Sequence, residues 1–450
     1  MREGLIIMKN KTILFLESRT QTTQWDLIAK HLVSRGHTIH WIVCSPVILP
    51  KTGTIHIIPF PKKQELETTT KDYLLDVSHS DRIVKYYKGN NFHYTYYDKQ
   101  LTKLLEQIKP DIVFGELANF HTHIMSKLCE SREIPFFQPS TARYPNKRFR
   151  FFYYDNLVGY EYKKNRDSIL NDRYVVSETI ENILHFKKQP DYMNVLSFKE
   201  KYERRYRALK FKIKLAYHRF MGDKYNIPSL IVAIALKYNA KAVLNKWLSK
   251  TKKLSELNYN KNILLYPVQM QPEFNLDVWG RRFNNQSQLV KEISQNLPDD
   301  WTLLIKLNPK SFLEMTDELL ATLELPNVVA LSISENMNNA LKQSKAVITV
   351  TGTVAIECSV KGINVFSLAK TDFTKFPYVQ HLNEIKELNN INNLLDITKD
   401  KQSNIIHYLY ENSSLGVIGE EITNPKCNDN DNIDLLNKAF DEFLEDYFDE

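Results

Sequence analysis

Two regions of the chain alternate short apolar runs with longer stretches in which apolar residues recur every three or four positions. In the first region, Trp25, Ile28 and Leu32 share one face of a predicted helix at 22–37. The same spacing predicts helices ending at 109 and spanning 121–133, and β-type apolar runs predict strands at 11–17, 38–44, 54–60, 111–115 and 134–139. Because alternating strands and helices form parallel sheets with right-handed crossovers, we predict an α/β domain over residues 1–160.

The second region repeats this alternation from residue 262 onward. Its predicted strands lie at 262–267, 301–307, 327–332, 346–352 and 363–368. Helical spacing predicts helices at 284–297, 311–323, 336–343 and 353–361. We therefore predict a second Rossmann-like domain over residues 256–415, and an α/β fold class with two such domains facing a cleft.

The stretch between these regions, residues 161–255, has few strand signals and long charged, aromatic helical spacing, so we interpret it as a basic helical insertion. Its apolar run at 230–236 is shorter than the roughly 18 residues of a membrane-spanning helix and is typical of a buried helix or strand. The tail at 416–450 joins a polar spacer to an amphipathic helix through Phe440 and Phe443. For this helix, packing on a domain surface is favoured over binding a partner.

Composition narrows the class of protein. With 450 residues and 43% hydrophobic content, the chain can fill two cores. The four cysteines form no CxxC pair, which predicts a reducing, cytoplasmic location and no zinc site. The clearest acidic pair, Asp429 and Asp431, lies in the polar tail rather than after an apolar strand. We therefore expect no metal and no bound cofactor.

Polar residues follow two strands of the second domain, where ligands of parallel α/β sheets bind. Gln269, Gln271 and Glu273 lie on a proline-stiffened loop, and their amides and carboxylate suit the hydroxyls and base edges of a sugar nucleotide. Lys306 and Asn308 end the next strand and could receive an anion near helix-terminal amides. The alternative is that these are ordinary solvated loops.

A third loop places Thr351, Gly352 and Thr353 at the start of a predicted helix. Glycine permits close approach of the backbone, and the exposed N–H groups and hydroxyls can bind a phosphate without a lysine. Glu357 lies one turn further and could accept hydrogen bonds from a ribose. A simple N-cap with a surface glutamate is the alternative.

The three loops together resemble a known family. The order YP-x-Q-x-Q-P-E, then K-x-x-P, then TGT-x-x-x-E followed by K-G, over residues 262–373, is similar to the capsule polysaccharide biosynthesis family, which includes retaining transferases of the acidic sugar Kdo. The resemblance implies a GT-B fold, a nucleotide-sugar donor on the second domain and an acceptor glycan or glycolipid on the first. The nucleotide sugar would be a co-substrate, CMP-linked in the Kdo enzymes.

Two departures from the family bear on the donor. Asn308 stands where the family usually has a histidine, and it can hydrogen-bond a phosphate or ribose but carries no charge. The aromatic-rich segment that often follows the last motif is reduced to AKTDF at 369–373. The identity of the donor sugar therefore stays open.

The first domain supplies candidate catalytic and acceptor residues. Glu116, at a strand end, is the predicted catalytic carboxylate, acting as nucleophile or base. His121, Ser140 and Arg143 follow strand ends nearby and are predicted to bind an acceptor or an anion. The resemblance also implies an acidic residue and a basic loop in this region. An incidental or structural glutamate is the alternative.

Basic segments at 147–151, 162–166, 201–214 and 245–253 intersperse Lys and Arg with aromatic residues. Such surfaces can dock on anionic lipid headgroups, which would place the protein at the inner face of the cytoplasmic membrane. No nucleic-acid motif accompanies these segments, so we expect no nucleic-acid partner. A plain solvated helical face is the alternative for each segment.

These observations favour a metal-independent glycosyltransferase that uses a nucleotide-sugar donor and a surface-polysaccharide or glycolipid acceptor. A sugar-nucleotide epimerase or a polyol-phosphate transferase on the same fold is the nearest alternative. A non-catalytic membrane- or nucleic-acid-binding protein, which would use the basic middle of the chain, is the alternative of another class.

Overall fold

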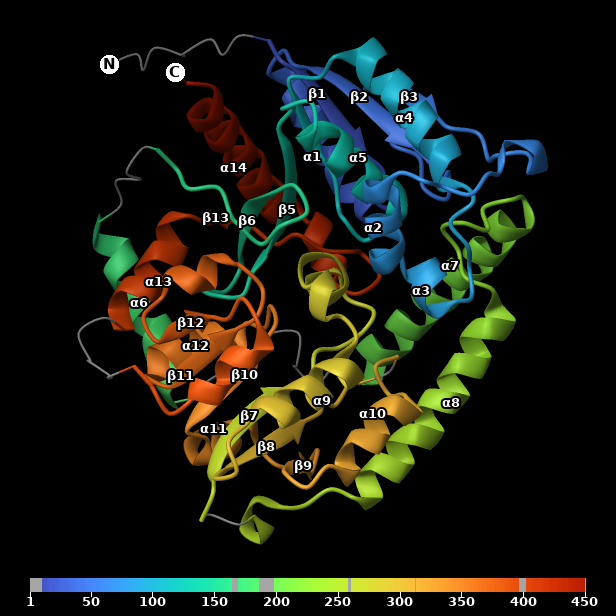
Figure 1. The fold of residues 1–450 in the computed structure, drawn as a ribbon. Helices are drawn as coiled ribbons and strands as arrows, with labels where there is room; N and C mark the ends of the chain where they lie inside the picture. The colour runs from blue at the N-terminus through green and yellow to red at the C-terminus, as the bar shows by residue number, and fades with distance from the viewer. Residues whose placement is uncertain are drawn as a thin grey trace.

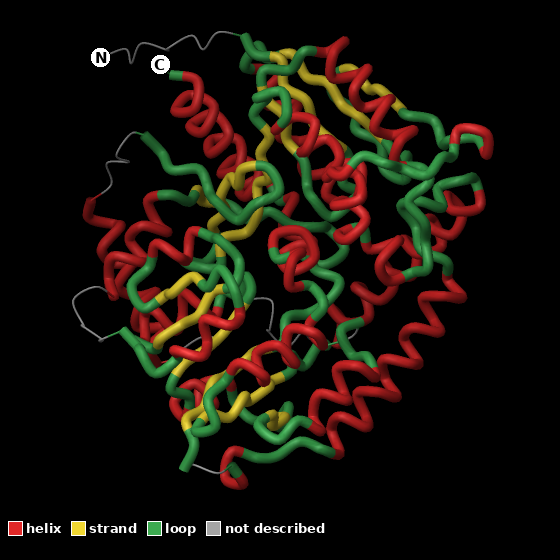
Figure 2. The backbone as a smooth tube through the Cα atoms, viewed as in Figure 1, coloured by secondary structure: helices red, strands yellow, loops and turns green. Residues whose placement is uncertain are grey.

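A computed structural model describes residues 10–163, 169–185, 198–257, 260–311, 313–395 and 402–449. The described chain contains two mainly parallel sheets flanked by helices, which lie in separate parts of the molecule (Figures 1 and 2). Part of the predicted basic segment at 162–166 lies outside the described residues.

The first sheet has the strand order β13-β6-β5-β4-β1-β2-β3. Its strands are β1 (Thr12–Leu16), β2 (Thr38–Val43), β3 (Thr54–Ile57), β4 (Ile112–Phe114), β5 (Phe136–Ala142), β6 (Arg148–Tyr153) and β13 (Ser414–Leu415). Neighbouring strands from β3 to β5 are parallel, whereas β6 and β13 are antiparallel. The helices of this domain are α1 (Thr22–Ser34), α2 (Asp72–Ser80), α3 (Arg82–Tyr86), α4 (Tyr94–Ile108) and α5 (Phe120–Glu130).

The second sheet is parallel throughout, with the order β12-β11-β10-β7-β8-β9. Its strands are β7 (Asn262–Pro267), β8 (Trp301–Lys306), β9 (Val328–Leu331), β10 (Ala346–Thr349), β11 (Asn364–Ser367) and β12 (Val379–His381). Its helices are α9 (Gln286–Asn296), α10 (Asp317–Ala321), α11 (Met337–Gln343) and α12 (Val354–Lys361), and α6 (Ile169–His185) and α13 (Gln402–Glu411) pack beside α12.

Both sheets have the doubly wound strand order of a Rossmann-like domain. Numbered within each domain, the parallel strands run 3-2-1-4-5 in the first sheet and 3-2-1-4-5-6 in the second. This confirms the predicted fold class of two Rossmann-like α/β domains with helices between them, a GT-B-like fold. The order reverses between β1 and β4 and between β7 and β10, so each domain has one switch point.

The end of the chain returns to the first domain. The short strand β13, which falls inside the predicted second domain, pairs with β6 of the first sheet. The tail helix α14 (Asn430–Phe448) packs against α1, and Phe440 and Phe443 are buried beside Phe15 and Phe114. The amphipathic pattern of the tail is thus satisfied by a domain surface.

Residues 148–151 of the basic segment at 147–151 are buried in β6, which corrects its interpretation as a lipid-docking surface. Arg148 donates to the carbonyl of Ser413 and to its hydroxyl, and Arg150 donates to the carbonyl of Asn412. Both side chains are buried because the returning chain covers them. Their charges therefore serve contacts inside the protein.

The middle of the chain forms two long helices, α7 (Phe198–Phe220) and α8 (Leu230–Ser249), along one edge of the molecule (Figure 1). The run at 230–236 is helical, but its expected burial is wrong, since Leu230, Ile231 and Ile234 are exposed. Among the described residues, no helix is long and apolar enough to span a bilayer.

Candidate functional site

The loop after β7 and the turn after β10 meet at the switch point of the second domain. Gln269 donates from Nε2 to Thr351 Oγ1 over 2.9 Å, and its Oε1 accepts from the Thr351 backbone N–H at 3.2 Å. Thr351 in turn donates to the Asn275 carbonyl. The predicted residues Gln269 and Thr351 therefore bond to each other and fix the two loops together.

The turn at the start of α12 is held by its own hydrogen bonds, and the N–H groups of Ala355 and Ile356 donate to the carbonyls of Gly352 and Thr353. Gly352 donates its N–H to Thr349 Oγ1 at 3.0 Å, and a β-carbon on Gly352 would collide with the same oxygen. Thr353 occupies the N-cap position, but its side chain makes no capping hydrogen bond. The N-terminal end of a helix dipole, with a hydroxyl beside it, favours an anion.

A cavity of about 220 Å³ opens at this turn, between the two domains. Thr351, Thr353 and Asn275 line it from the second domain. Ser140 and Arg143, at and just beyond the end of β5, line it from the first. Four of the residues predicted from separate strand ends, Ser140, Arg143, Thr351 and Thr353, thus share one cavity.

The charge of the Arg143 guanidinium acts on two carboxylates of the second domain, Glu273 in the loop after β7 and Glu357 in helix α12. Burial raises the pKa of Glu357, and a hydrogen bond of 2.9 Å from the Tyr144 hydroxyl and the charges of Lys361 and Arg143 oppose this rise. Burial also raises the pKa of Glu273, again against the charge of Arg143. Arg143 therefore provides positive charge beside both predicted donor-binding glutamates.

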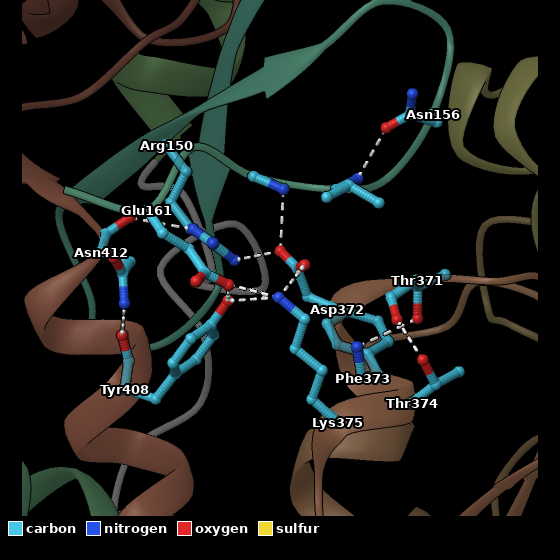
Figure 3. Close-up of polar contacts among 12 residues, drawn as sticks. Arg150, Asn156, Glu161, Thr371, Asp372, Phe373, Thr374, Lys375, Tyr408 and Asn412 are labelled. Carbon is cyan, nitrogen blue, oxygen red and sulfur yellow. Dashed lines mark hydrogen bonds and ion pairs between the residues drawn. The ribbon is translucent and has the colours of Figure 1, made fainter. Parts of the chain in front are cut away.

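The cavity also contains a buried ion pair that joins the domains (Figure 3). Arg150 Nη1, on β6, lies 2.8 Å from Asp372 Oδ2, and the two side chains are 3% and 1% exposed. Gly159 donates its N–H to the same carboxylate oxygen. Among the described residues, Arg150 Nη2 and Asp372 Oδ1 have no hydrogen-bond partner, although the Lys375 ammonium lies 3.7 Å from Oδ1. A ligand hydroxyl could accept from the first atom and donate to the second.

Gln271, Lys306 and Asn308 are not among the residues that line the cavity. Gln271 is buried and donates to Asp277 and to the Asn284 carbonyl, and Asn308 accepts from the Lys310 backbone N–H within its own turn. Lys306 is buried at the end of β8, and its burial lowers the pKa of its ammonium. The side chains of Gln271 and Asn308 make hydrogen bonds within their own part of the chain. Direct contact of Gln271, Lys306 or Asn308 with a donor therefore stays a prediction.

Glu116 lies at the switch point of the first domain, beside the loop after β1. It accepts a hydrogen bond from the Ser18 hydroxyl, and the positive charges of Arg19 and Arg82 act on it. Burial raises the pKa of Glu116 to about 7, against the effect of these groups. A carboxyl group with this pKa can exchange a proton near neutral pH. Glu116 does not line the cavity described above.

His121 is placed where an acceptor cannot reach it. Its side chain is fully buried in α5, and Nε2 lies 3.2 Å from Glu17 Oε1, itself fully buried. The position of His121 therefore argues against direct acceptor binding and indicates a contact with Glu17 in the core.

Three acid and histidine side chains, Asp76, His123 and Asp155, lie close enough to share a metal ion. However, Arg281 forms ion pairs with Asp76 at 2.8 Å and Asp155 at 3.0 Å, and Lys127 lies 2.7 Å from Asp155. These two cations already supply the positive charge that a metal would bring. The cluster is thus an ion-pair network that connects the domains through Arg281.

Sequence reasoning missed Ser18, Arg19 and Arg82 beside Glu116, and Arg150 and Asp372 in the cavity. Ser18 and Arg19 directly follow a predicted strand, so their strand-end position was an available signal. Arg150 and Asp372 carried none, because their pairing joins strand β6 of one domain to a loop of the other.

No protein-family model and no curated protein matches the chain. Among solved structures, it is similar to Thermosulfurimonas dismutans KpsC, a beta Kdo 2,7 transferase, with 8% identity and a TM-score of 0.37 over 91% of this chain and 93% of that one. It is also similar to UDP-GlcNAc 2-epimerase from Neisseria meningitidis bound to UDP-GlcNAc, with 14% identity and a TM-score of 0.28 over 89% and 98%. The calicheamicin glycosyltransferase CalG4 gives 13% identity and a TM-score of 0.23 over 90% and 94%.

With TM-scores below 0.5, these similarities carry no argument about activity. The assignment of a GT-B-like fold rests on the strand orders and on the returning tail. The resemblance to the capsule polysaccharide biosynthesis family remains a prediction.

Proposed function

We propose that the protein is a glycosyltransferase that binds a nucleotide-sugar donor in the cavity between its two domains. The observation that carries this proposal is the cavity itself, which unites the turn at the start of α12 with Ser140 and Arg143 of the opposite domain. The N-terminus of α12 and the Arg143 guanidinium both favour the negative charge of a phosphate. Such a pairing suits a donor that must present its phosphate to one domain and its sugar to an acceptor held by the other.

The ion pair between Arg150 and Asp372 supports a sugar as the ligand. Arg150 Nη2 and Asp372 Oδ1, which have no hydrogen-bond partner among the described residues, offer one donor and one acceptor in a dry environment, where a polar atom without a hydrogen bond is costly. A sugar hydroxyl satisfies both atoms, whereas an apolar ligand satisfies neither. We therefore assign recognition of the transferred sugar to this pair and binding of the phosphate to the turn at Thr353.

Glu116 is the proposed catalytic carboxylate, and because it does not line the cavity, this role requires the reacting end of the donor to reach the switch point of the first domain. As a base, it would take the proton from the acceptor hydroxyl while that oxygen bonds to the anomeric carbon and the bond to the donor phosphate breaks. In the Glu116→Gln variant, we expect transfer to fall by at least about 100-fold. In the parent protein, we expect the transfer rate to rise with pH through about 7, because the carboxylate form increases there. If the Glu116→Gln variant kept both the transfer rate and the pH profile, Glu116 would not be the catalytic base.

A thermal-shift panel of CMP-, CDP-, UDP- and GDP-linked sugars tests donor binding, since a ligand that binds only the folded state raises its melting temperature. We expect one nucleotide class to stabilise the protein selectively. Thr353→Val should weaken this shift without changing the melting temperature of the free protein, because the side chain makes no capping hydrogen bond. Thr54→Val, on the exposed edge strand β3, is the matched control. Equal shifts in both variants would contradict a phosphate site at Thr353.

A second assay distinguishes a transferase from an epimerase. A transferase should release nucleotide rapidly only when an acceptor is present, whereas an epimerase would convert its donor without one. If the protein epimerised its donor with no acceptor present, it would be a sugar-nucleotide epimerase and the proposed transfer activity would be wrong.

A further inference from the structure

An apolar stripe runs along the solvent-facing side of α7. Its residues recur at intervals of four or three, so they lie on one side of the helix. Every one of them is between 58% and 87% exposed: Tyr202, Tyr206, Leu209, Ile213, Tyr217 and Phe220. Large apolar side chains are ordinary on a surface when single, but a contiguous row of them marks an interaction site.

Helix α8 carries a second exposed apolar row. Near its start, Leu230, Ile231, Ile234 and Tyr238 are exposed, with Ile231 at 81%. Near its end, the residues at 240, 243 and 247 are buried in the core of the second domain. The helix therefore has one apolar face buried against the protein and a second apolar face exposed to solvent.

Positive charge flanks these apolar rows. The sequence of α7 contains nine Lys or Arg residues and two Glu, and that of α8 contains three Lys and no acidic residue. Helical geometry puts Arg205 and Lys212 on one side of the α7 stripe and Lys210 and Lys214 on the other. The exposed surface is thus apolar along its middle and cationic along its borders.

The protein holds these helices firmly through the turn between them. Asp223 is fully buried, accepts from the Ser45 hydroxyl and also accepts from Asn226 Nδ2. Tyr225 stacks on His93 in the core of the first domain. The pair of helices thus contacts the first domain through this turn and the second domain through the end of α8. Figure 2 shows both helices beside the rest of the chain.

We propose that the exposed faces of α7 and α8 dock the protein on a bilayer that contains anionic lipids. Interfacial helices bury an apolar face about 5–10 Å into the headgroup region while Lys and Arg on their borders meet the lipid phosphates. A second copy of the same face would bring like charges together, and a nucleic acid would leave the aliphatic row in water. The charge and apolar content together therefore select a membrane surface. This surface lies outside the cavity, so it stands independently of the proposed transfer activity.

Cosedimentation of the full chain with vesicles tests the proposal. We expect binding to phosphatidylglycerol–phosphatidylcholine vesicles, little binding to pure phosphatidylcholine, and weaker binding as salt rises. Ile213→Ser combined with Phe220→Ser should weaken binding by about tenfold or more. Leu49→Ser combined with Phe92→Ser changes two exposed apolar residues elsewhere and should bind as the parent does.

Circular dichroism and melting temperature serve as folding controls, and both double variants should match the parent. Unchanged vesicle binding in the Ile213 and Phe220 variant, with its fold intact, would overturn the proposal. If the parent self-associates and does not bind vesicles, and the Ile213 and Phe220 variant loses this self-association, the face is instead an interface between copies. Binding of RNA but not of vesicles would equally overturn a membrane partner.

Discussion

Helices α14 and α7 have the same apolar spacing but opposite surroundings. In α14, Phe440 and Phe443 point into the core of the first domain and are fully buried. In α7, Ile213 and Phe220 occupy equivalent positions in a repeating stripe, yet they face solvent. Figure 1 shows the two helices on opposite sides of the molecule. Helical spacing therefore identifies an apolar face without specifying what covers it.

The charges beside the two apolar faces also differ. The sequence of α14 contains six acidic residues and one Lys, and α1, which it covers, presents His31 and Arg35 to Asp441. The borders of α7 are basic and meet no comparable acidic helix among the described residues. The charges that flank a helix therefore indicate what kind of partner covers its apolar face, whereas the apolar spacing does not.

The sharpest test of the buried side of this comparison is Phe440→Ala. The Phe440 ring contacts Trp25, Phe114 and Phe151, so its removal should lower the free energy of unfolding by about 3–5 kcal/mol. Urea denaturation measures the loss. A change below about 1 kcal/mol would mean that α14 contributes little to the first domain.

Asp446 tests the polar contacts that hold the same helix. Its carboxylate accepts from the Tyr160 hydroxyl at 2.7 Å and from the Lys163 backbone N–H at 2.9 Å, and it is buried. Asp446→Ala should lower the free energy of unfolding by about 1–3 kcal/mol, because both donors lose their acceptor. Denaturation of the Tyr160→Phe variant provides the control, since it removes one of the two contacts and should cost less.

The smallest effect is expected on the exposed side. Ile213→Ala in α7 should change the free energy of unfolding by less than about 0.5 kcal/mol, because the side chain is 64% exposed. The same denaturation measurement applies. A loss comparable to that of Phe440→Ala would show that the stripe is covered within the folded protein, and the comparison between the helices would fail.

Much of the fold could be predicted because strands and helices reveal themselves by local periodicity. The turn at Thr351 and the loop at Gln269 were expected at strand ends, and the doubly wound order brings those ends together. The strand β6 was missed because Arg148 and Arg150 look like surface residues until the returning chain covers them. Long-range pairing of this kind leaves no local pattern.

The candidate site was predictable in part for the same reason. Ser140, Arg143 and Thr353 follow or end strands, and they line the cavity. For His121, helical position alone did not show that Glu17, 104 positions earlier in the chain, is buried beside it. The pairing of Arg150 with Asp372 depends on how the two domains meet, which periodicity does not encode.

The most direct test of the central claim is a crystal structure of the protein with the nucleotide sugar that stabilises it most. The account predicts a phosphate about 3 Å from the backbone amides at the start of α12, with the sugar beside Arg150 and Asp372. A nucleotide sugar bound away from this cavity, with the Thr353 turn unoccupied, would contradict it.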